Sequence, residues 1–89
     1  MREYYVEKQL KKKLRVLLRK DKIRYSIVLT KMEEVVARED VDHYKNLRAP
    51  LQHLKRVHID SHFVLVFRYD AASDIIFFYD LDHHEKIYK

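Results

Sequence analysis

Residues 62–79 read HFVLVFRYDAASDIIFFY, and their apolar period of two is typical of strands. In the first half, Phe63 to Tyr69, the positions alternate between two faces and are rich in β-branched and aromatic residues. The polar run at 70–74 predicts a connection, after which residues 75–79 form another strand. Because residues 75–79 are apolar on both faces, we expect this strand near the centre of a sheet.

The same period begins earlier in the chain. Val57 and Ile59 alternate with polar neighbours, which predicts one more strand and so a meander of three. Upstream, residues 37–50 show no sustained period, and Pro50 biases Ala49 toward extended backbone. We therefore expect a loop before the meander.

The N-terminal part has the period of a helix instead. Steps of four, four, three and one residues separate the apolar positions Val6, Leu10, Leu14, Leu17 and Leu18. This stripe predicts a helix that starts near Tyr5. A second apolar stripe runs from residue 23 to residue 36. The polar residues Asp21 and Lys22 interrupt the apolar pattern between the two stripes. The pattern predicts two antiparallel helices joined by a tight turn.

Two helices followed by a strand meander indicate an α+β fold. We expect two N-terminal antiparallel helices packed on one face of a small, mainly antiparallel sheet of three to four strands. The other face of the sheet would stay partly open, and a functional site would lie there. With 89 residues and a mass of 11.0 kDa the chain is long enough for one core, so residues 1–89 should form a single domain.

Absent residue types exclude several classes of function. The chain has no cysteine, so it has no disulfide, no thiolate zinc site and no cysteine nucleophile. It has no glycine, which argues against phosphate-cradling loops and nucleophile elbows. No stretch approaches the roughly 20 apolar residues of a membrane span, and the charged N-terminus lacks the apolar run of a signal peptide. We expect a cytoplasmic protein with no membrane partner.

Positive charge is concentrated in the first helix. The chain carries 19 Lys and Arg against 14 Asp and Glu, a net charge of +5. Between residues 8 and 22, every charged side chain except Asp21 is basic. This run is either a solvated helix face or a surface for nucleic acid or an acidic partner.

Histidines gather in two places that the meander can bring together. His58 and His62 flank the turn between the first two strands, and His83 and His84 follow the third. Each one alone could be an ordinary surface histidine. Together they could serve a metal site, nucleophilic catalysis or RNA cleavage.

RNA cleavage without a metal suits these residues best. The four-residue spacing of His58 and His62 places metal ligands together on a helix, but here the backbone is extended. The serines lack a glycine-built oxyanion turn. Cleavage of RNA needs a base for the ribose 2′-hydroxyl, an acid for the leaving 5′-oxygen and a cation at the phosphate. Histidine serves as base or acid near neutral pH.

Three segments between Leu47 and Tyr88 resemble the RelE/ParE toxin superfamily. They are LRAPLQHLKRVHI at 47–59, HFVLVFRY at 62–69 and DHHEKIY at 82–88. The most specific parts are R-x-H-I before a strand of the form F-V-L-V-F-R, and H-x-x-x-[YF] near the end. The most similar subtypes are the YafQ-like and RelE-like messenger-RNA interferases. A strand usually opens this fold, and only Glu3 to Val6 could supply it here.

The resemblance implies the toxin of a type II toxin–antitoxin pair. Such a protein is a ribosome-dependent endoribonuclease, which cleaves messenger RNA by metal-free attack of the ribose 2′-hydroxyl and is inhibited by a cognate antitoxin. It needs no cofactor. The motif positions imply a catalytic set of His58, His62, His84 and Tyr88. They imply an RNA- and phosphate-binding set of Lys55, Arg56, Phe63, Arg68 and His83.

Two positions depart from the family pattern. Asp80 stands about where relatives carry a catalytic arginine, and Val64 replaces an arginine of RelE-type strands. Charge for the transition state would then come from Arg56, Arg68 or the ribosome. These departures keep two alternatives open: a catalytically silent RelE-fold protein that binds an antitoxin or another partner, and a ParE-like gyrase inhibitor.

The aromatic and apolar strand residues are most simply core. This applies to Phe63, Leu65, Phe67, Phe77 and Tyr79. Stacking on RNA bases is left to any of them that lies exposed on the open face of the sheet.

Overall fold

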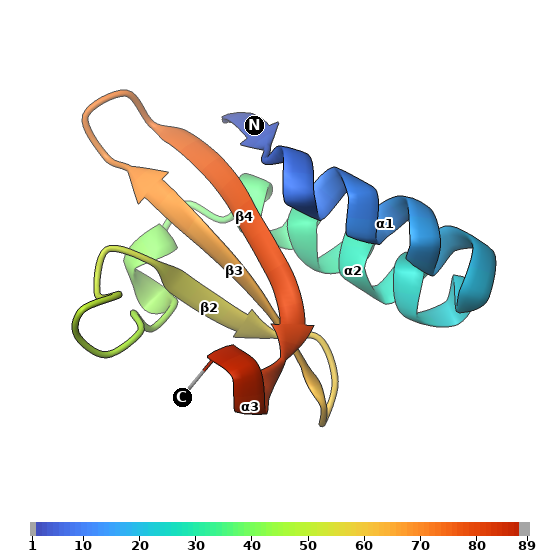
Figure 1. Cartoon of the computed structure of the whole chain (residues 1–89). Helices are drawn as coiled ribbons and strands as arrows, with labels where there is room; N and C mark the ends of the chain where they lie inside the picture. Colours follow the sequence, from blue (N-terminus) through green and yellow to red (C-terminus); the bar gives the residue numbers. More distant parts are fainter. Residues whose placement is uncertain (1, 88–89) are drawn as a thin grey trace.

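Over residues 2–87, the computed structural model shows four strands in one mixed sheet (Figure 1). The strands are β1 (Glu3–Val6), β2 (Lys55–His58), β3 (Phe63–Asp70) and β4 (Ile75–His83), in the order β1-β4-β3-β2. β1 runs parallel to β4, whereas the other two pairs are antiparallel. The predicted meander is confirmed, and the strand that starts at Ile75 lies inside the sheet as expected.

Two strand boundaries differ from the prediction. The first helix begins at Lys8 and not near Tyr5, because Tyr5 pairs with Phe77 and continues the sheet as part of β1. β4 continues beyond Tyr79 to His83. Its polar residues there do not end the strand, since the polar side chains alternate with Leu81, which faces the core. Tyr79 is the extra residue of a bulge in this strand.

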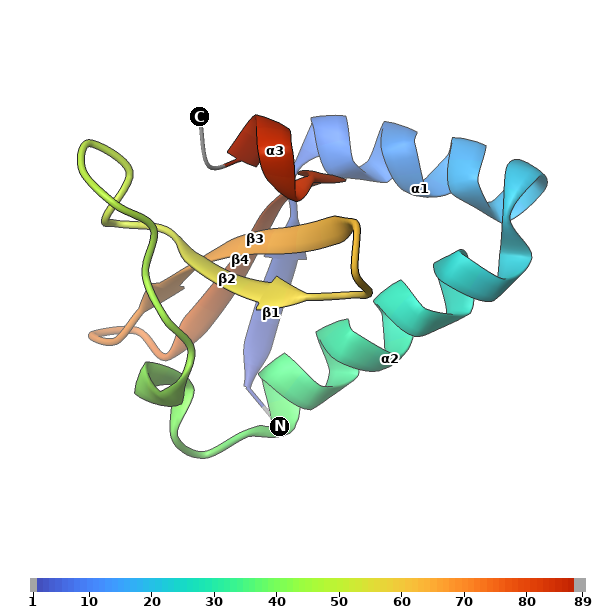
Figure 2. The same ribbon diagram turned by 90° about the horizontal axis from the view of Figure 1, so that it is seen from below.

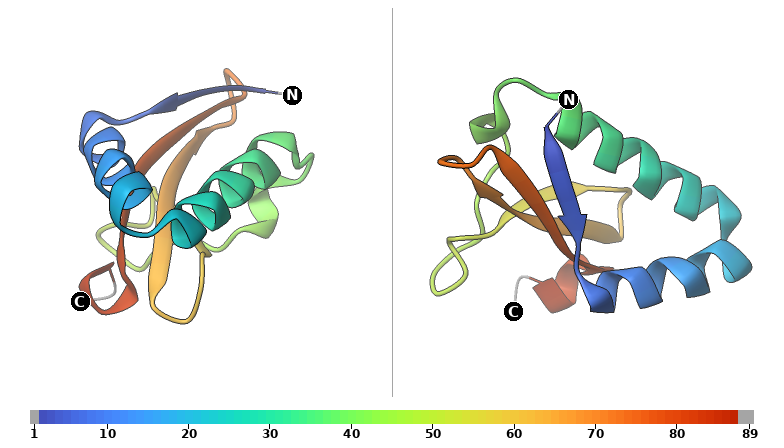
Figure 3. Two further views of the ribbon diagram at one scale, coloured as in Figure 1. Left: turned by 90° about the vertical axis from the view of Figure 1, so that its right-hand side faces the viewer. Right: turned by 90° about the horizontal axis from the view of Figure 1, so that it is seen from above.

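Two helices, α1 (Lys8–Lys20) and α2 (Lys22–Ala37), form the predicted hairpin. Asp21 ends the first helix by donating its backbone N–H to the Leu17 carbonyl at 2.8 Å. It begins the second by accepting the Arg24 N–H on its side chain at 3.0 Å. Figures 2 and 3 show the hairpin on one side of the sheet, with its turn farthest from the strands. No helix within the described residues is long and apolar enough to cross a membrane.

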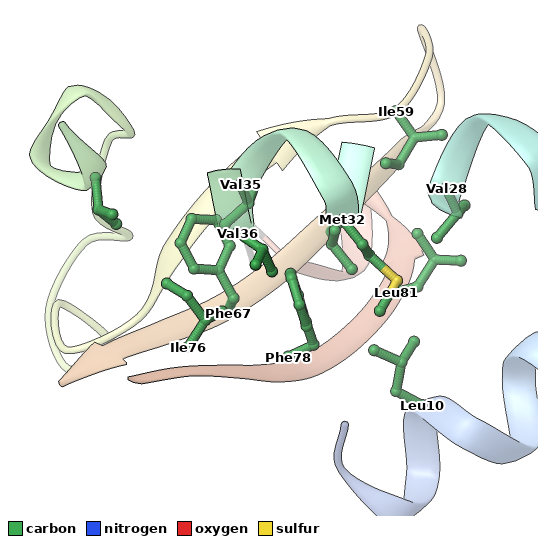
Figure 4. Close-up of a cluster of buried hydrophobic side chains, with 12 residues drawn as sticks. Leu10, Val28, Met32, Val35, Val36, Ile59, Phe67, Ile76, Phe78 and Leu81 are labelled. Carbon is green, nitrogen blue, oxygen red and sulfur yellow. The ribbon is translucent and has the colours of Figure 1, made fainter. Parts of the chain in front are cut away.

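The main core lies between the helices and the sheet (Figure 4). Phe67 of β3 and Phe78 of β4 are fully buried there, with ring centroids 6.1 Å apart. Leu10, Val28 and Val35 of the two helices are fully buried against them. The helical stripes and the strand alternation therefore meet in one core, as the sequence predicts.

The opposite side of the sheet, which we call the open face, is only half open. Val64 and Val66 of β3 point to this side and are buried under Leu47, Leu54 and Ile87. Their cover consists of the loop before β2 and the short helix α3 (His84–Ile87). That loop also contains a 3-10 turn, η1 (Val41–His43). The loop and α3 cover this half of the open face because the β3 residues there, Val64 and Val66, are apolar.

An ion pair joins α2 to the turn between β2 and β3. Arg24 donates from Nε to Asp60 Oδ2 at 2.9 Å, and the other carboxylate oxygen accepts the backbone N–H groups of His62 and Phe63. Burial raises the pKa of Asp60, but these hydrogen bonds and the guanidinium outweigh burial and lower the pKa to about 2. The turn that carries His62 is therefore held in place by a charged carboxylate.

We expect Phe78→Ala to lower the free energy of unfolding by about 3–5 kcal/mol, because it removes a fully buried ring. Phe77→Ala, at the adjacent half-buried position on the open face, should have less than half of this effect. Urea unfolding followed by circular dichroism measures both changes. Equal losses for the two variants would contradict the assignment of the faces.

Asp60 should make stability depend on pH. Its carboxyl has a lower pKa folded than unfolded, so its contribution is complete above the unfolded value of 3.8 and is lost as the pH falls toward 2. Because the pair is partly solvated, we expect a loss of only about 1 kcal/mol across this range. Urea unfolding between pH 5 and pH 2 should show a loss about 1 kcal/mol smaller in Asp60→Asn than in the wild type, because Asp70, Asp74 and Asp82, whose pKa values are also lowered, titrate in both proteins.

The matched control for this pH series is Asp40→Asn, which removes a carboxyl whose side chain is exposed and makes no ion pair within residues 2–87. It should keep the pH dependence of the wild type. If Asp60→Asn kept it as well, the carboxylate would not be the group that titrates with unfolding.

Candidate functional site

The open face carries two polar rows across the sheet. In one row, His58 of β2 and Asp82 of β4 both pair with Val64 of β3. In the next row, Arg56 and Asp80 both pair with Val66. The outer members of each row are separated by two strand spacings, roughly 10 Å. His58 and Arg56 of β2 are therefore separated from the two carboxylates of β4 by the buried Val64 and Val66.

The structure brings the backbones of two of the histidine segments together. His84 donates its backbone N–H to the His62 carbonyl at 2.9 Å, which ties the start of α3 to the turn after His58. His83 pairs with Phe63 in the same corner. We call this corner of the sheet, defined by His58, His62 and His84, the histidine end. His58 and His62 are exposed there, and His84 is half-buried.

Two of the predicted RNA contacts lie on the other side of the sheet. The rings of Phe63 and His83 are 4.4 Å apart, and Phe63 packs against the main core. The Arg24 guanidinium lies 4.3 Å from the Phe63 ring centroid. Phe63 and His83 therefore face the helices and not Arg56 or His58. Their contact with RNA stays a prediction, and any such contact would be made from the helical side.

Lys55 has structural partners. Its Nζ donates to the Tyr44 carbonyl at 3.1 Å and to Asn46 Oδ1 at 3.0 Å, and its side chain is almost fully buried. It holds the loop before β2 and, by strand alternation, points away from Arg56. The predicted phosphate contact of Lys55 would compete with these bonds. The contact stays a prediction.

Arg56 and Arg68 both lie on the open face. Arg56 is half-buried in the row next to His58, and Arg68 is exposed one row farther along β3. The Arg68 guanidinium lies 4.2 Å from the centroid of the Phe77 ring. Both arginines therefore share the open face with His58, and their contact with phosphate stays a prediction. Tyr88, the last predicted catalytic residue, lies outside the described residues.

Lys13 is the residue that sequence reasoning missed. From α1 it reaches over the edge of β4, where Nζ lies 2.8 Å from Asp80 and 3.2 Å from Asp82 and donates to the Leu81 carbonyl at 3.0 Å. Burial lowers the pKa of Lys13, but the hydrogen bonds and charges of both aspartates raise it overall. The carboxylate at the position of the family arginine is therefore paired with a cation. The sequence did contain one signal for this role. Lys13 precedes Leu14 and so lies at the border of the apolar stripe of α1, from which a long side chain can reach the sheet.

Two hollows adjoin the covered half of the open face. The larger, of about 570 Å³, is lined by residues 46–51 together with Arg56 and Ile87. The smaller, of about 250 Å³, includes His53, Tyr79 and Asp80 in its lining. Within residues 2–87, no group of three or more His, Cys, Asp or Glu side chains is arranged to hold a metal ion.

Comparison with known proteins gives two relatives that span nearly the whole chain, although no family model matches the sequence. An uncharacterized protein of Methanosarcina mazei is 47% identical over 83 residues, which cover 93% of this chain and 94% of that protein. A protein of Methanocaldococcus jannaschii named "Putative toxin RelE4" is 46% identical over 89 residues, which cover 100% of this chain and 93% of that protein.

Several solved structures share the fold. A metal-bound toxin from Helicobacter pylori has a TM-score of 0.75 at 16% identity and covers 98% of this chain and 99% of its own. The RelBE2 toxin–antitoxin complex of Mycobacterium tuberculosis has a TM-score of 0.74 at 17% identity, with coverages of 92% and 96%. The DinJ-YafQ complex of Escherichia coli has a TM-score of 0.66 at 13% identity, with full coverage of both chains. At these identities the likeness shows the fold alone.

The fold and the relatives agree with the resemblance carried by the strand and histidine motifs. The helical hairpin on a four-stranded mixed sheet is a fold that this chain shares with the solved toxin structures. The full-length identity with the M. jannaschii protein is far above the level at which a shared fold alone is indicated. The chain therefore belongs to the RelE family of toxins.

Proposed function

We propose that this chain is the toxin of a type II toxin–antitoxin pair, and that it cleaves messenger RNA on the ribosome without a metal ion. The observation that carries the proposal is the histidine end. His58 ends β2, His84 follows β4, and the hydrogen bond from His84 to His62 ties the two strand ends together. His58 lies two residues from the half-buried Arg56 on the same face of β2, and the backbone of His84 is bonded to the turn that follows His58.

The proposed reaction needs one base and one acid. One imidazole of the pair His58 and His84 takes the proton of the ribose 2′-hydroxyl, and the 2′-oxygen attacks the adjacent phosphorus. The bond from phosphorus to the 5′-oxygen breaks, and the imidazolium of the pair protonates that oxygen. The products are a 2′,3′-cyclic phosphate and a free 5′-hydroxyl. Arg56 offers its guanidinium to the phosphoryl oxygens as negative charge develops on them.

The two aspartates of β4 would oppose this reaction if they were unpaired. A carboxylate near the phosphate repels it, and Asp80 and Asp82 lie on the same face as Arg56. Lys13 is paired with both, and Lys86 lies 3.8 Å from Asp82. The four charges sum to zero, so the proposal assigns Lys13 the role of a positioning residue, which neutralises the carboxylates without touching the RNA.

An antitoxin is the expected protein partner. The RelBE2 and DinJ-YafQ structures are toxin–antitoxin complexes, and this chain shares their fold. Six cations of α1 make no ion pair within residues 2–87, and they present a surface for an acidic partner or for ribosomal RNA: Lys8, Lys11, Lys12, Arg15, Arg19 and Lys20. The contribution of such a surface to RNA affinity weakens steeply as the salt concentration rises.

A second candidate function is antitoxin binding without catalysis. Asp80 favours it, because the resemblance places an arginine at this position. Val64 favours it as well, since it is fully buried and leaves no cation in the centre of the open face. Cleavage distinguishes the two candidates, whereas antitoxin binding is common to both.

We expect His84→Ala to lower cleavage by about 10²–10⁴-fold, the usual contribution of a general acid or base. Induced expression of the wild type should arrest growth and yield discrete cuts in a reporter messenger RNA by primer extension, and His84→Ala should do neither. His58→Ala should behave like His84→Ala. His43→Ala, which replaces an exposed histidine of η1, is the matched control and should cut normally. Normal cutting by His84→Ala would refute the assigned role.

The Lys13 assignment gives a separate prediction. Lys13→Met should lower cleavage about tenfold, because an unpaired charge about 10 Å from the phosphate acts with about 1–2 kcal/mol at an effective dielectric near 20. The double variant Lys13→Met/Asp80→Asn should recover most of this loss. Lys12→Met, at the exposed adjacent position, is the control. If the double variant were as slow as Lys13→Met, the lysine would act by some means other than neutralising Asp80.

A further inference from the structure

Beyond the histidine end, the open face carries a row of planar side chains. Tyr5 of β1 and Arg68 of β3 both pair with Phe77 of β4, so the three occupy one row across the sheet. The rings of Tyr5 and Phe77 are stacked, with centroids 5.6 Å apart and an interplanar angle of 18°. The Arg68 guanidinium lies 4.2 Å from the Phe77 centroid on the other side. We call these three residues the aromatic row.

The aromatic row is not part of either hydrophobic cluster. The prediction that Phe77 and Tyr79 belong to the core is wrong. Neither ring belongs to a buried cluster, and Tyr79 is 44% exposed. Tyr5 is 51% exposed. Its hydroxyl donates to Glu3 Oε1 at 2.8 Å, which fixes the ring above the sheet. Large exposed rings on a flat, rigid surface mark an interaction site more often than a structural one.

The row is continuous with the candidate catalytic region. Tyr79 lies just beyond Phe77 on β4 and lines the 250 Å³ hollow together with Val66 and Asp80. Val66 pairs directly with Arg56. A chain lying on the aromatic row would approach Arg56 and the histidine end past Tyr79, around the residues that cover Val66.

At its other end the row is bounded by negative charge. Glu3 and Asp70 both pair with Ile75, two residues before Phe77, and so lie on the same side of the sheet as the row. A polyanion would be repelled there and attracted toward Arg68 and Arg56. The charge pattern thus favours a polyanion that extends from the aromatic row toward the histidines and not toward Glu3 and Asp70.

We propose that the aromatic row and Tyr79 form a stacking platform for two or three nucleotides of single-stranded RNA that flank the cleavage site. Aromatic faces stack on unpaired bases of any sequence, and arginine stacks on a base while it contacts the phosphate. A duplex keeps its bases inside, and an acidic peptide would use Arg68 but not the rings. The identity of the RNA as a substrate rests on the proposed function, but binding to the platform does not.

The test is a fluorescence anisotropy titration of the full chain with a labelled 12-nucleotide oligouridylate. Tyr5→Leu should raise the Kd roughly tenfold, because it keeps an apolar strand residue and removes the ring. Arg68→Gln should raise it by a similar factor, and Tyr5→Phe should leave it within twofold. Thermal unfolding of each variant shows that the fold is retained.

Tyr4→Leu is the matched control. Tyr4 precedes Tyr5 on the same strand and has the same exposure of 51%, but it contacts Phe78 on the helical side at a centroid distance of 5.8 Å. It should bind the oligonucleotide like the wild type. Equal losses for Tyr4→Leu and Tyr5→Leu, or no loss for either, would overturn the proposal.

Two further ligands distinguish single-stranded RNA from other possible occupants of the aromatic row. A 12-base-pair RNA duplex should bind with no dependence on Tyr5, and a Tyr5-dependent duplex would overturn the stacking mechanism. A 12-residue oligoglutamate that displaces the RNA with dependence on Arg68 but not on Tyr5 would assign the surface to an acidic protein instead. Primer extension separates this proposal from the catalytic one. Wild-type chain that binds RNA through Tyr5 but never cuts it would support the platform and refute the ribonuclease.

Discussion

Every other feature of the molecule takes its position from the pairing of β3 with β4. These are the two inner strands, and their register decides which side chains face the helices. A slip of one residue would turn Phe67 outward and bring Arg68 into the apolar core, which is prohibitive for an unpaired charge. The register therefore has one stable solution. The same solution places the histidines at the strand ends and the arginines on the open face.

A chain without glycine closes the β3–β4 turn by other means. Asp74 adopts a φ of 57°, in the left-handed region that glycine usually occupies. Aspartate tolerates this region better than most residues, and here its carboxylate accepts Tyr69 Oη–H at 2.7 Å and Arg2 Nε–H at 2.8 Å. Arg2 also donates to backbone carbonyls at the end of α2, among them that of Val36 at 3.0 Å. One guanidinium thus fixes the start of β1, and with it the place of Tyr5 beside Phe77.

The sequence was sufficient for the architecture because its periods are local signals. The stripes of α1 and α2 and the alternation in β3 each report which face is buried, and the two faces meet in one core. Strand ends were less predictable. β1 is only four residues long and continues into the helical stripe, so its apolar residues resemble a helix start. Asp80 and Asp82 hide the second half of β4, since they interrupt the apolar run on its open side.

The candidate site was predictable where it depends on strand order and not where it depends on contacts between layers. Strand ends bring His58, His62 and His84 together, and that follows from a meander. Lys13 reaches Asp80 from the helical layer, and no spacing in the sequence links positions 67 residues apart. The hydrogen bonds of Lys55 to Asn46 and Tyr44 were likewise not predictable, because they lie in a segment whose sequence shows no period.

The buried Val64 explains how the open face differs from the family pattern. Leu47, Leu54 and Ile87 cover this position, so an arginine there would be desolvated beneath apolar side chains and would compete with Lys13 and Lys86 for the carboxylate of Asp82, which is costly by several kcal/mol. Apolar cover and a central arginine therefore exclude each other. Once the cover is present, cations for a phosphate must lie outside it, and Arg56 and Arg68 lie on either side of it. In the proposed function RNA would follow the edge of this cover, so that the aromatic row leads past Tyr79 toward the histidine end.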